Sequence, residues 1–345
     1  MSEGVGSSLS HVERVEGVGI KTSGMRIAGI DLLRGVAAFG IVGCHLSLAP
    51  RTAGGELVTA LCDFNVGLFA AVAGFLMCGG SGGGSWLEYL RKRARRLLPT
   101  YFVWSLVFIM ATIAFDLLLD GGHLNPKYGT AGFWGRVVFV GDAATHLWFL
   151  ACLFYAQAIL HGAFRSCADK WHGLMWIGLG GVAICMSVLL SDWFGKYPLR
   201  LIAFLMTGYG FGCCLQGGMF DVCKRHNGMF WCVAISALVL HVLLRGFVPG
   251  FIRDWFAVGP VMLAFIGCGF KSERWVKVAV LLGATSLGVY LVHPLITRGL
   301  SVAVVRFWPS PYSAAVVLGE WVLAWCISFA FVNLLRRMPV AERFV

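Results

Sequence analysis

Long apolar segments separated by short polar ones follow one another along nearly the whole chain. A helix needs about 20 predominantly apolar residues to cross a bilayer, and most of these segments approach that length. The pattern predicts an all-α protein, a polytopic membrane helical bundle of about ten transmembrane helices. The expected spans are residues 27–48, 57–78, 97–119, 144–163, 174–193, 199–216, 229–247, 255–270, 278–300 and 314–335.

The two ends of the chain are more polar than the region between them. We expect residues 1–26 to be a cytoplasmic tail, residues 27–335 the transmembrane domain, and residues 336–345 a short cytoplasmic C-terminal tail. A secretory signal peptide is the competing interpretation of the N-terminus, because Ser47-Leu48-Ala49 resembles a cleavage site. The arginine in the first apolar segment and the length of the leader argue against it.

The distribution of basic residues predicts the topology. With the N-terminus inside, inner segments hold 18 Lys and Arg residues and outer segments hold 9. Cytoplasmic loops are enriched in these residues. We therefore expect both termini to lie inside.

Composition agrees with a membrane protein and excludes several other classes. Of 345 residues, 58% are hydrophobic and 13% are charged, with a net charge of +11. A soluble domain is about 25% charged. The positive charge reflects the topology and contact with anionic lipid, so no nucleic-acid partner is expected. The 12 cysteines form no CxxC pair and have no metal-like spacing with histidine, so neither a disulfide framework nor a metal site is expected.

The first expected span carries two costly residues, Arg34 and His45. Eleven residues make about three helical turns, so both side chains lie on one face, roughly 16 Å apart along the axis. Ionisable residues inside a membrane are candidates for a functional site. The structural alternatives are an arginine that reaches the inner headgroups, paired with Asp31, and a histidine packed between helices.

A basic run from Arg91 to Arg96 precedes the third span, after the glycine-rich segment 79–85, which we interpret as a hinge. Five of its six residues are Lys or Arg. The run has two interpretations: an anchor on anionic lipid, or a site for a phosphate-rich ligand from the cytoplasm.

Three further polar residues are expected in the outer half of the membrane, at the depth of His45: His146, His293 and Glu320. Histidine suits proton transfer because its unperturbed pKa is about 6.5. In a transferase, an anionic donor could bind on the cytoplasmic side while a base or transient acceptor acts near the outer face. The same residues would also suit the relay of a proton-coupled transporter.

Five motifs, in order, resemble those of the acyltransferase 3 family of integral membrane acyltransferases. They are Asp31-Leu-Leu-Arg34-Gly35 through His45, Asn65-Val-Gly-Leu-Phe through Phe75, Arg93-Ala-Arg-Arg96-Leu-Leu-Pro99-Thr-Tyr101, His146-Leu-Trp-Phe-Leu150, and Ser286-Leu-Gly-Val-Tyr-Leu-Val-His293-Pro294. The chain departs from the family pattern at Gly67, Ala73 and Gly288. These departures bear on substrate details.

The resemblance implies transfer of an acyl group, usually acetyl from acetyl-CoA, to a carbohydrate hydroxyl across the bacterial inner membrane. It implies that Arg34 and His45 are essential, with His45 as a base or transient acyl acceptor, and that Arg93 and Arg96 bind the CoA phosphates. The substrate site would be lined by His146, Trp148 and His293. Glu320 is a further candidate for this site, because it is expected at the same depth in the membrane. The expected partners are acyl-CoA, a surface polysaccharide or its lipid-linked precursor, and membrane lipid. A transporter of a small organic anion or polysaccharide remains the alternative.

Overall fold

The computed structural model describes residues 27–46, 53–78, 85–119, 129–139, 146–164, 170–189, 196–270, 272–307, 313–339 and 341–345. The N-terminal tail, Ser47-Leu48-Ala49 and all but the last residue of the glycine-rich segment lie outside these ranges.

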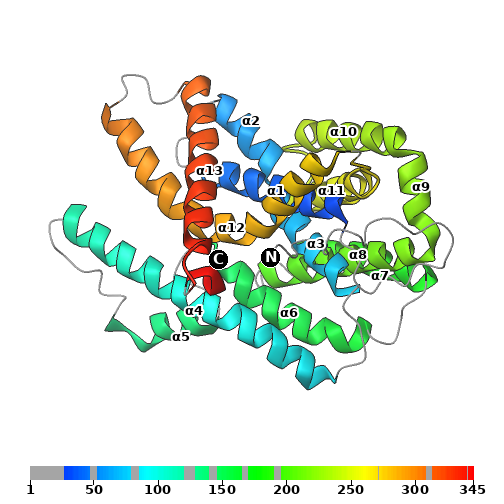
Figure 1. The fold of residues 1–345 in the computed structure, drawn as a ribbon, viewed down its shortest axis with the longest axis horizontal. Helices are drawn as coiled ribbons and strands as arrows, with labels where there is room; N and C mark the ends of the chain where they lie inside the picture. The colour runs from blue at the N-terminus through cyan, green and yellow to red at the C-terminus, as the bar shows by residue number, and fades with distance from the viewer. Residues whose placement is uncertain are drawn as a thin grey trace, which may run out of the picture.

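Within the described ranges, all regular elements are helical, which confirms the all-α prediction (Figure 1). The α-helices are α1 Ala28–Cys44, α2 Ala53–Cys62, α3 Asn65–Cys78, α4 Trp86–Leu119, α5 Ala131–Phe139, α6 Trp148–Phe164, α7 Lys170–Leu189, α8 Lys196–Cys214, α9 Phe220–Arg225, α10 Asn227–Leu243, α11 Gly250–Ile266, α12 Glu273–Phe307 and α13 Ala314–Arg336. A π-helical turn, Leu215–Met219, joins α8 to α9, and a 3₁₀ turn, Ala341–Phe344, follows α13.

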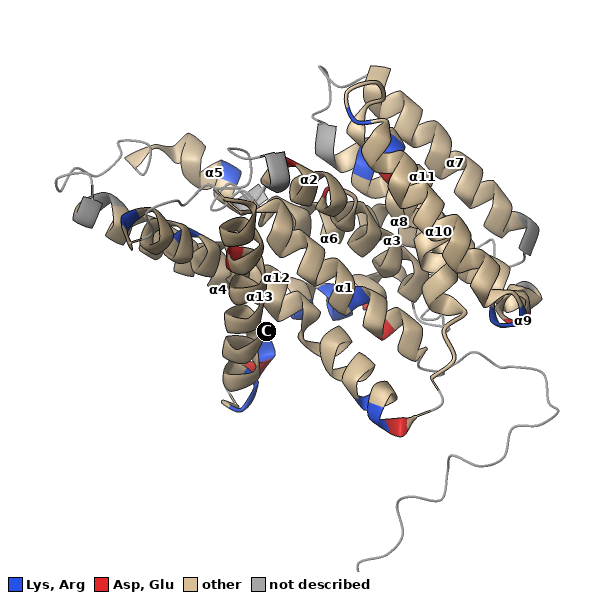
Figure 2. Ribbon diagram, turned by 90° about the horizontal axis from the view of Figure 1, so that it is seen from above, with Lys and Arg blue, Asp and Glu red and all other residues tan. Residues whose placement is uncertain are grey.

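Several of these helices have the length and composition of membrane spans. The described residues contain five such segments: Gly55–Cys78, Trp86–Phe115, His172–Leu189, Glu273–Phe307 and Ala314–Arg336. Charged residues gather mainly near helix ends, with long uncharged stretches between them (Figure 2). The protein is therefore a multi-pass membrane protein, whereas ten spans and inside termini stay predictions.

The second predicted span is broken in the structure. It consists of α2 and α3, separated by a turn at Asp63 and Phe64. The break leaves carbonyls at the end of α2 without helical partners. The side chain of Asn65 donates to the Cys62 carbonyl at 2.8 Å, and His241 of α10 lies 2.9 Å from the Ala60 carbonyl. Non-helical backbone is tolerated at membrane depth where protein groups satisfy it in this way.

Helix α4 begins eleven residues before the predicted third span. Its first turn is closed by a capping box, in which the Ser85 N–H donates to Glu88 at 2.7 Å and the Glu88 N–H donates to the Ser85 hydroxyl at 3.2 Å. The basic run therefore forms the first turns of a long helix. Hydropathy alone missed this start because the run is charged.

Glycines bring several helices into close contact. A Cβ atom at Gly74 of α3 would lie 2.0 Å from the carbonyl oxygen of Leu205 in α8. One at Gly283 of α12 would lie 2.5 Å from the Asp31 carboxylate of α1. Small residues at such interfaces allow backbones in a membrane to approach. These contacts fix α1 against α12 and α3 against α8.

The C-terminal segment packs against the bundle. Trp104 of α4 donates its indole N–H to the Phe344 carbonyl at 2.9 Å, and Val345 packs against the main apolar core. Residues 341–345, predicted as part of a tail, thus contact the middle of α4.

Candidate functional site

Three histidines that are far apart in the sequence meet in the structure. His45 follows the last residue of α1, His146 precedes α6, and His293 lies within α12. The ring centroids are 5.1 Å apart for His45 and His293, 5.7 Å for His146 and His293, and 6.5 Å for His45 and His146. We call these three residues the histidine cluster.

The proline that follows His293 determines the state of its ring. Pro294 has no N–H and cannot donate to the Tyr290 carbonyl four residues earlier. The Nδ1 atom of His293 lies 2.8 Å from that oxygen and 3.2 Å from the Val289 carbonyl. Since a carbonyl only accepts, Nδ1 carries the hydrogen, and Nε2 of the neutral ring therefore has a lone pair.

One ring nitrogen of His146 and one of His293 can contact a ligand. Within the described part of the chain, the Nε2 atoms of His146 and His293 are buried without a hydrogen-bond partner. Buried polar groups are normally hydrogen-bonded, so these two atoms are candidates for contact with a substrate. His293 can accept a proton at Nε2 without any change of tautomer.

Aromatic residues hold the cluster in place. Tyr290 donates its hydroxyl hydrogen to the backbone carbonyl of His146, and Phe108 of α4 packs edge-on against the His146 ring, with centroids 4.7 Å apart. The Tyr290 ring in turn contacts Phe69 and Phe149. These contacts connect α12 to α3, α4 and α6 around the histidines.

The predicted phosphate-binding arginines lie near the start of α4, beside the end of α6. Arg93 stands over the Tyr89 ring, 5.2 Å from its centroid, and Tyr89 stacks on His161 with centroids 3.7 Å apart. Fifteen residues separate Arg93 from Phe108 and His161 from His146, or about 22 Å along each helix. Arg93 and Arg96, one helical turn apart, are thus about 22 Å from the level of the histidine cluster along these helices.

Arg34 lies apart from the histidines. Its guanidinium forms an ion pair with Asp31, with Nη1 and Oδ1 3.6 Å apart, and its side chain keeps 21% exposure. This is the structural alternative that the sequence suggested for Arg34. Arg34 and His45 are about 16 Å apart along α1, the separation that the sequence predicts.

Glu320 of α13 is buried against α12. One carboxylate oxygen accepts a hydrogen bond from Ser301, and the other has no hydrogen-bond partner in the described part of the chain. Ser301 follows His293 and Thr297 at four-residue intervals, and all three are buried. A buried polar face of α12 therefore leads from the histidine cluster to Glu320, over about 12 Å.

A family model described as an acyltransferase domain matches residues 27–334. The chain belongs to the acyltransferase 3 family. Comparisons with curated proteins and with solved structures gave no match. Family and fold together make this acyltransferase a multi-pass membrane enzyme that transfers acyl groups.

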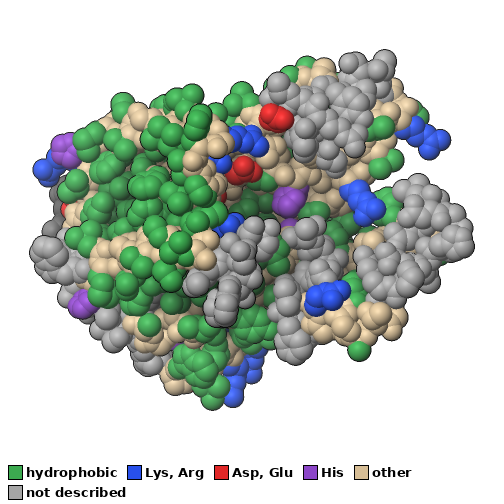
Figure 3. Space-filling view, turned by 180° about the vertical axis from the view of Figure 1, so that it is seen from behind, with side chains coloured by type: hydrophobic (Ala, Val, Ile, Leu, Met, Phe, Trp, Pro, Cys, Tyr) green, Lys and Arg blue, Asp and Glu red, His purple; other side chains and the backbone are tan. Residues whose placement is uncertain are grey.

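Trp148 of this acyltransferase, two residues after His146, lines a cavity of about 480 Å³. Three charged residues line it as well: Asp63, Arg200 and Asp254. The sequence analysis missed them, although each is a charge within or at the edge of an apolar segment. From one face, acidic, basic and histidine side chains gather beside a largely hydrophobic surface (Figure 3).

Proposed function

We propose that this enzyme transfers an acetyl group from cytoplasmic acetyl-CoA to a carbohydrate hydroxyl on the outer side of the bacterial inner membrane. The acceptor is a surface polysaccharide or its lipid-linked precursor. The N- and C-termini lie in the cytoplasm in this account.

The donor binds at Arg93 and Arg96. Two guanidinium groups on one side of α4 suit the several phosphates of CoA, because arginine forms paired charge-assisted hydrogen bonds with phosphate. The thin pantetheine arm extends along α4 and α6 toward the histidine cluster. Arg34, held by Asp31, contacts the donor along this path.

Two routes complete the reaction at the cluster. In the direct route, His45 removes the proton of the acceptor hydroxyl as its oxygen attacks the thioester carbonyl. The C–O bond forms, the C–S bond breaks, and the histidine proton passes to the CoA thiolate. In the covalent route, a His45 nitrogen attacks the thioester carbonyl, the C–S bond breaks, and CoA leaves as its thiol with the proton of the other His45 nitrogen. The acceptor hydroxyl then attacks the acetyl-imidazole, the C–N bond breaks, and Nε2 of His293 takes the hydroxyl proton and returns it to His45.

The observation that supports this proposal best is the placement of the two groups. Cationic side chains lie near the start of α4 and the end of α6, and three histidines lie near the start of α6, about 22 Å away. A donor with an anionic head and a long arm ending in a reactive thioester fits this separation. His293 and His146 line the site, with the Nε2 lone pair of His293 available to accept a proton.

Purified protein in nanodiscs with [¹⁴C]acetyl-CoA and neutral sugars tests the proposal. We expect labelled sugar and free CoA from the wild type and neither from His45→Ala. Passage of an unaltered sugar across vesicles, without consumption of acetyl-CoA, would favour the transporter instead.

A further inference from the structure

The cavity that Trp148 lines joins four parts of the chain. Asp63 belongs to the turn between α2 and α3, Trp148 to α6, Arg200 to α8 and Asp254 to α11. Its volume of about 480 Å³ is in the range of small-molecule sites. Trp148 is two residues from His146, so the cavity and the histidine cluster share the start of α6.

Aromatic rings form much of the wall. Phe204, Phe251 and Trp148 line the cavity, and the Arg200 guanidinium lies 3.8 Å from the centroid of the Phe251 ring. Flat apolar surfaces with a few placed polar groups are typical of sites that bind small molecules. The Arg200 guanidinium supplies donors, while the Asp63 and Asp254 carboxylates supply acceptors.

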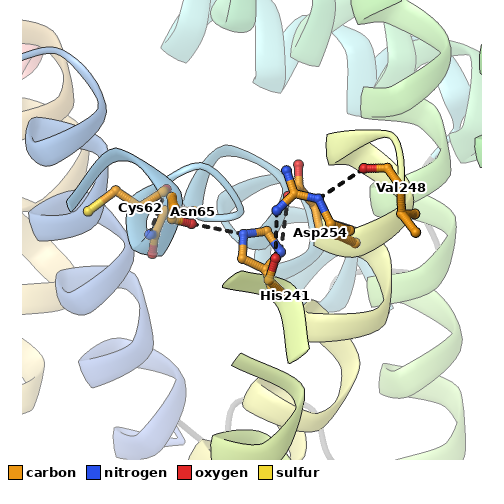
Figure 4. A network of polar contacts seen from close by, with 7 residues as sticks. Cys62, Asn65, His241, Val248 and Asp254 are labelled. Atoms are coloured by element: carbon orange, nitrogen blue, oxygen red, sulfur yellow. Dashed lines mark hydrogen bonds and ion pairs between the residues drawn. The ribbon is translucent and has the colours of Figure 1, made fainter. Parts of the chain in front are cut away.

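A buried histidine lies next to Asp254. The Nε2 atom of His241 carries a hydrogen, because it lies 2.9 Å from the Ala60 carbonyl (Figure 4). Its Nδ1 atom is 3.6 Å from the Asp254 carboxylate. The two atoms are too far apart for a hydrogen bond, and both are buried without a hydrogen-bond partner in the described part of the chain.

The charges at the cavity balance. The lining has two carboxyl groups, Asp63 and Asp254, and one guanidinium, Arg200, and Arg253, next to Asp254 in the chain, adds a second guanidinium. Arg253 donates to the His241 carbonyl at 2.6 Å and to the Val248 carbonyl at 3.2 Å (Figure 4). A neutral lining with both donors and acceptors does not favour phosphates, but it suits a neutral ligand rich in hydroxyl groups.

We infer that this cavity binds the acceptor as a neutral sugar ring. Hydroxyl groups of the ring pair with Asp63, Asp254 and Arg200, and its apolar face lies on the aromatic wall. The ring is then held against Trp148, which lies two residues along the chain from His146. This inference rests on the proposed function for the identity of the reaction, but sugar binding can be measured without any reaction.

Saturation-transfer NMR on protein in nanodiscs tests it, with the methyl glycosides of glucose, galactose and N-acetylglucosamine as probes. We expect signals from at least one glycoside with the wild type, and at least about fivefold weaker signals with Asp254→Asn and with Arg200→Gln. Asp221→Asn, an exposed carboxylate of α9, is the matched control and should bind like the wild type. Asp63→Asn is a third, independent variant in case either of the others fails to fold, as judged by size-exclusion chromatography.

Three results would overturn the inference: no glycoside signal with the wild type, unchanged signals in the folded variants, or stronger binding of glucose 6-phosphate than of methyl glucoside. A fivefold loss of acetyl-CoA affinity in Asp254→Asn would also overturn it, because the cavity would then bind the donor. Two outcomes distinguish this inference from the proposed function. If the wild type binds sugar through these residues but does not transfer acetyl, only the proposed function is refuted. If the wild type transfers acetyl but the cavity variants bind sugar normally, only the cavity inference is refuted.

Discussion

His293→Asn separates the two nitrogens of the His293 ring. The amide nitrogen of asparagine is as many bonds from Cα as Nδ1 of histidine, so it can still donate to the Tyr290 carbonyl. The variant has no counterpart of Nε2, the atom that holds the lone pair. The matched variant His293→Ala removes both nitrogens.

The structure sets the expected magnitudes. The Tyr290 carbonyl, which Pro294 leaves without a helical partner, receives the Nδ1 hydrogen at 2.8 Å. Without any donor, this buried carbonyl costs about 1–3 kcal/mol of stability, whereas a retained donor keeps stability near that of the wild type. Loss of a proton-transfer group lowers the rate by about 10²–10⁴-fold. His293→Asn should therefore be stable and slow, and His293→Ala unstable and slow.

The assay is acetyl transfer from [¹⁴C]acetyl-CoA, measured with the thermal unfolding of each variant in the same detergent. Transfer by His293→Asn within threefold of the wild type would refute the role of Nε2 as a proton acceptor. Equal unfolding temperatures for the Asn and Ala variants would refute the argument that Nδ1 satisfies the Tyr290 carbonyl.

Three further predictions concern other parts of the molecule. His45→Ala should lower acetyl transfer by at least about 10²-fold while the protein stays folded; near-normal turnover would contradict its assigned role. Arg93→Ala with Arg96→Ala should raise the KM for acetyl-CoA about tenfold or more and change kcat little, and an unchanged KM would indicate a lipid anchor. Gly74→Ala should destabilise the protein by about 1–3 kcal/mol, because its Cβ would lie 2.0 Å from the Leu205 carbonyl oxygen. Gly178→Ala in α7, where a Cβ meets no atom within 4 Å, is the control and should be neutral or stabilising in thermal unfolding.

Periodicity and hydropathy were sufficient for the helical class and for the approximate position of most helices. They missed the break at Asp63 and the start of α4, because both depend on particular hydrogen bonds. His241, far along the chain, satisfies a carbonyl at the end of α2, and the Ser85–Glu88 capping box supports a charged first turn. Neither of these hydrogen-bonding contacts can be read from the average hydropathy of a segment.

The histidine cluster was predictable only in part. Depth placed His45, His146 and His293 near one level of the membrane, and the structure brings them together. The same reasoning placed Glu320 at this level; in the structure it bonds to Ser301, about two helical turns from His293 in α12. Predicted depth gives only the position of a residue along the membrane normal. Contact also depends on which helices are neighbours, and the packing of the bundle determines that arrangement.

The cavity residues could not be grouped from the sequence. Asp63 and Arg200 are more than 130 residues apart in the sequence, and Arg200 and Asp254 are about 50 apart. Each of the three is equally well explained as a charge near a membrane surface. Only the packing of α3, α6, α8 and α11 brings them to one cavity.

The central claim is that acetyl passes from a donor bound at the start of α4 to an acceptor at the histidine cluster. It is tested most directly by separating the two substrates across a membrane. Protein is reconstituted into sealed vesicles with [¹⁴C]acetyl-CoA on one side and neutral methyl glycosides on the other, in both arrangements. The account predicts acetylated sugar on the sugar side and free CoA on the donor side in the arrangement that matches the predicted topology. Acetylation only with both substrates on one side, or passage of unaltered sugar without loss of acetyl-CoA, would contradict it.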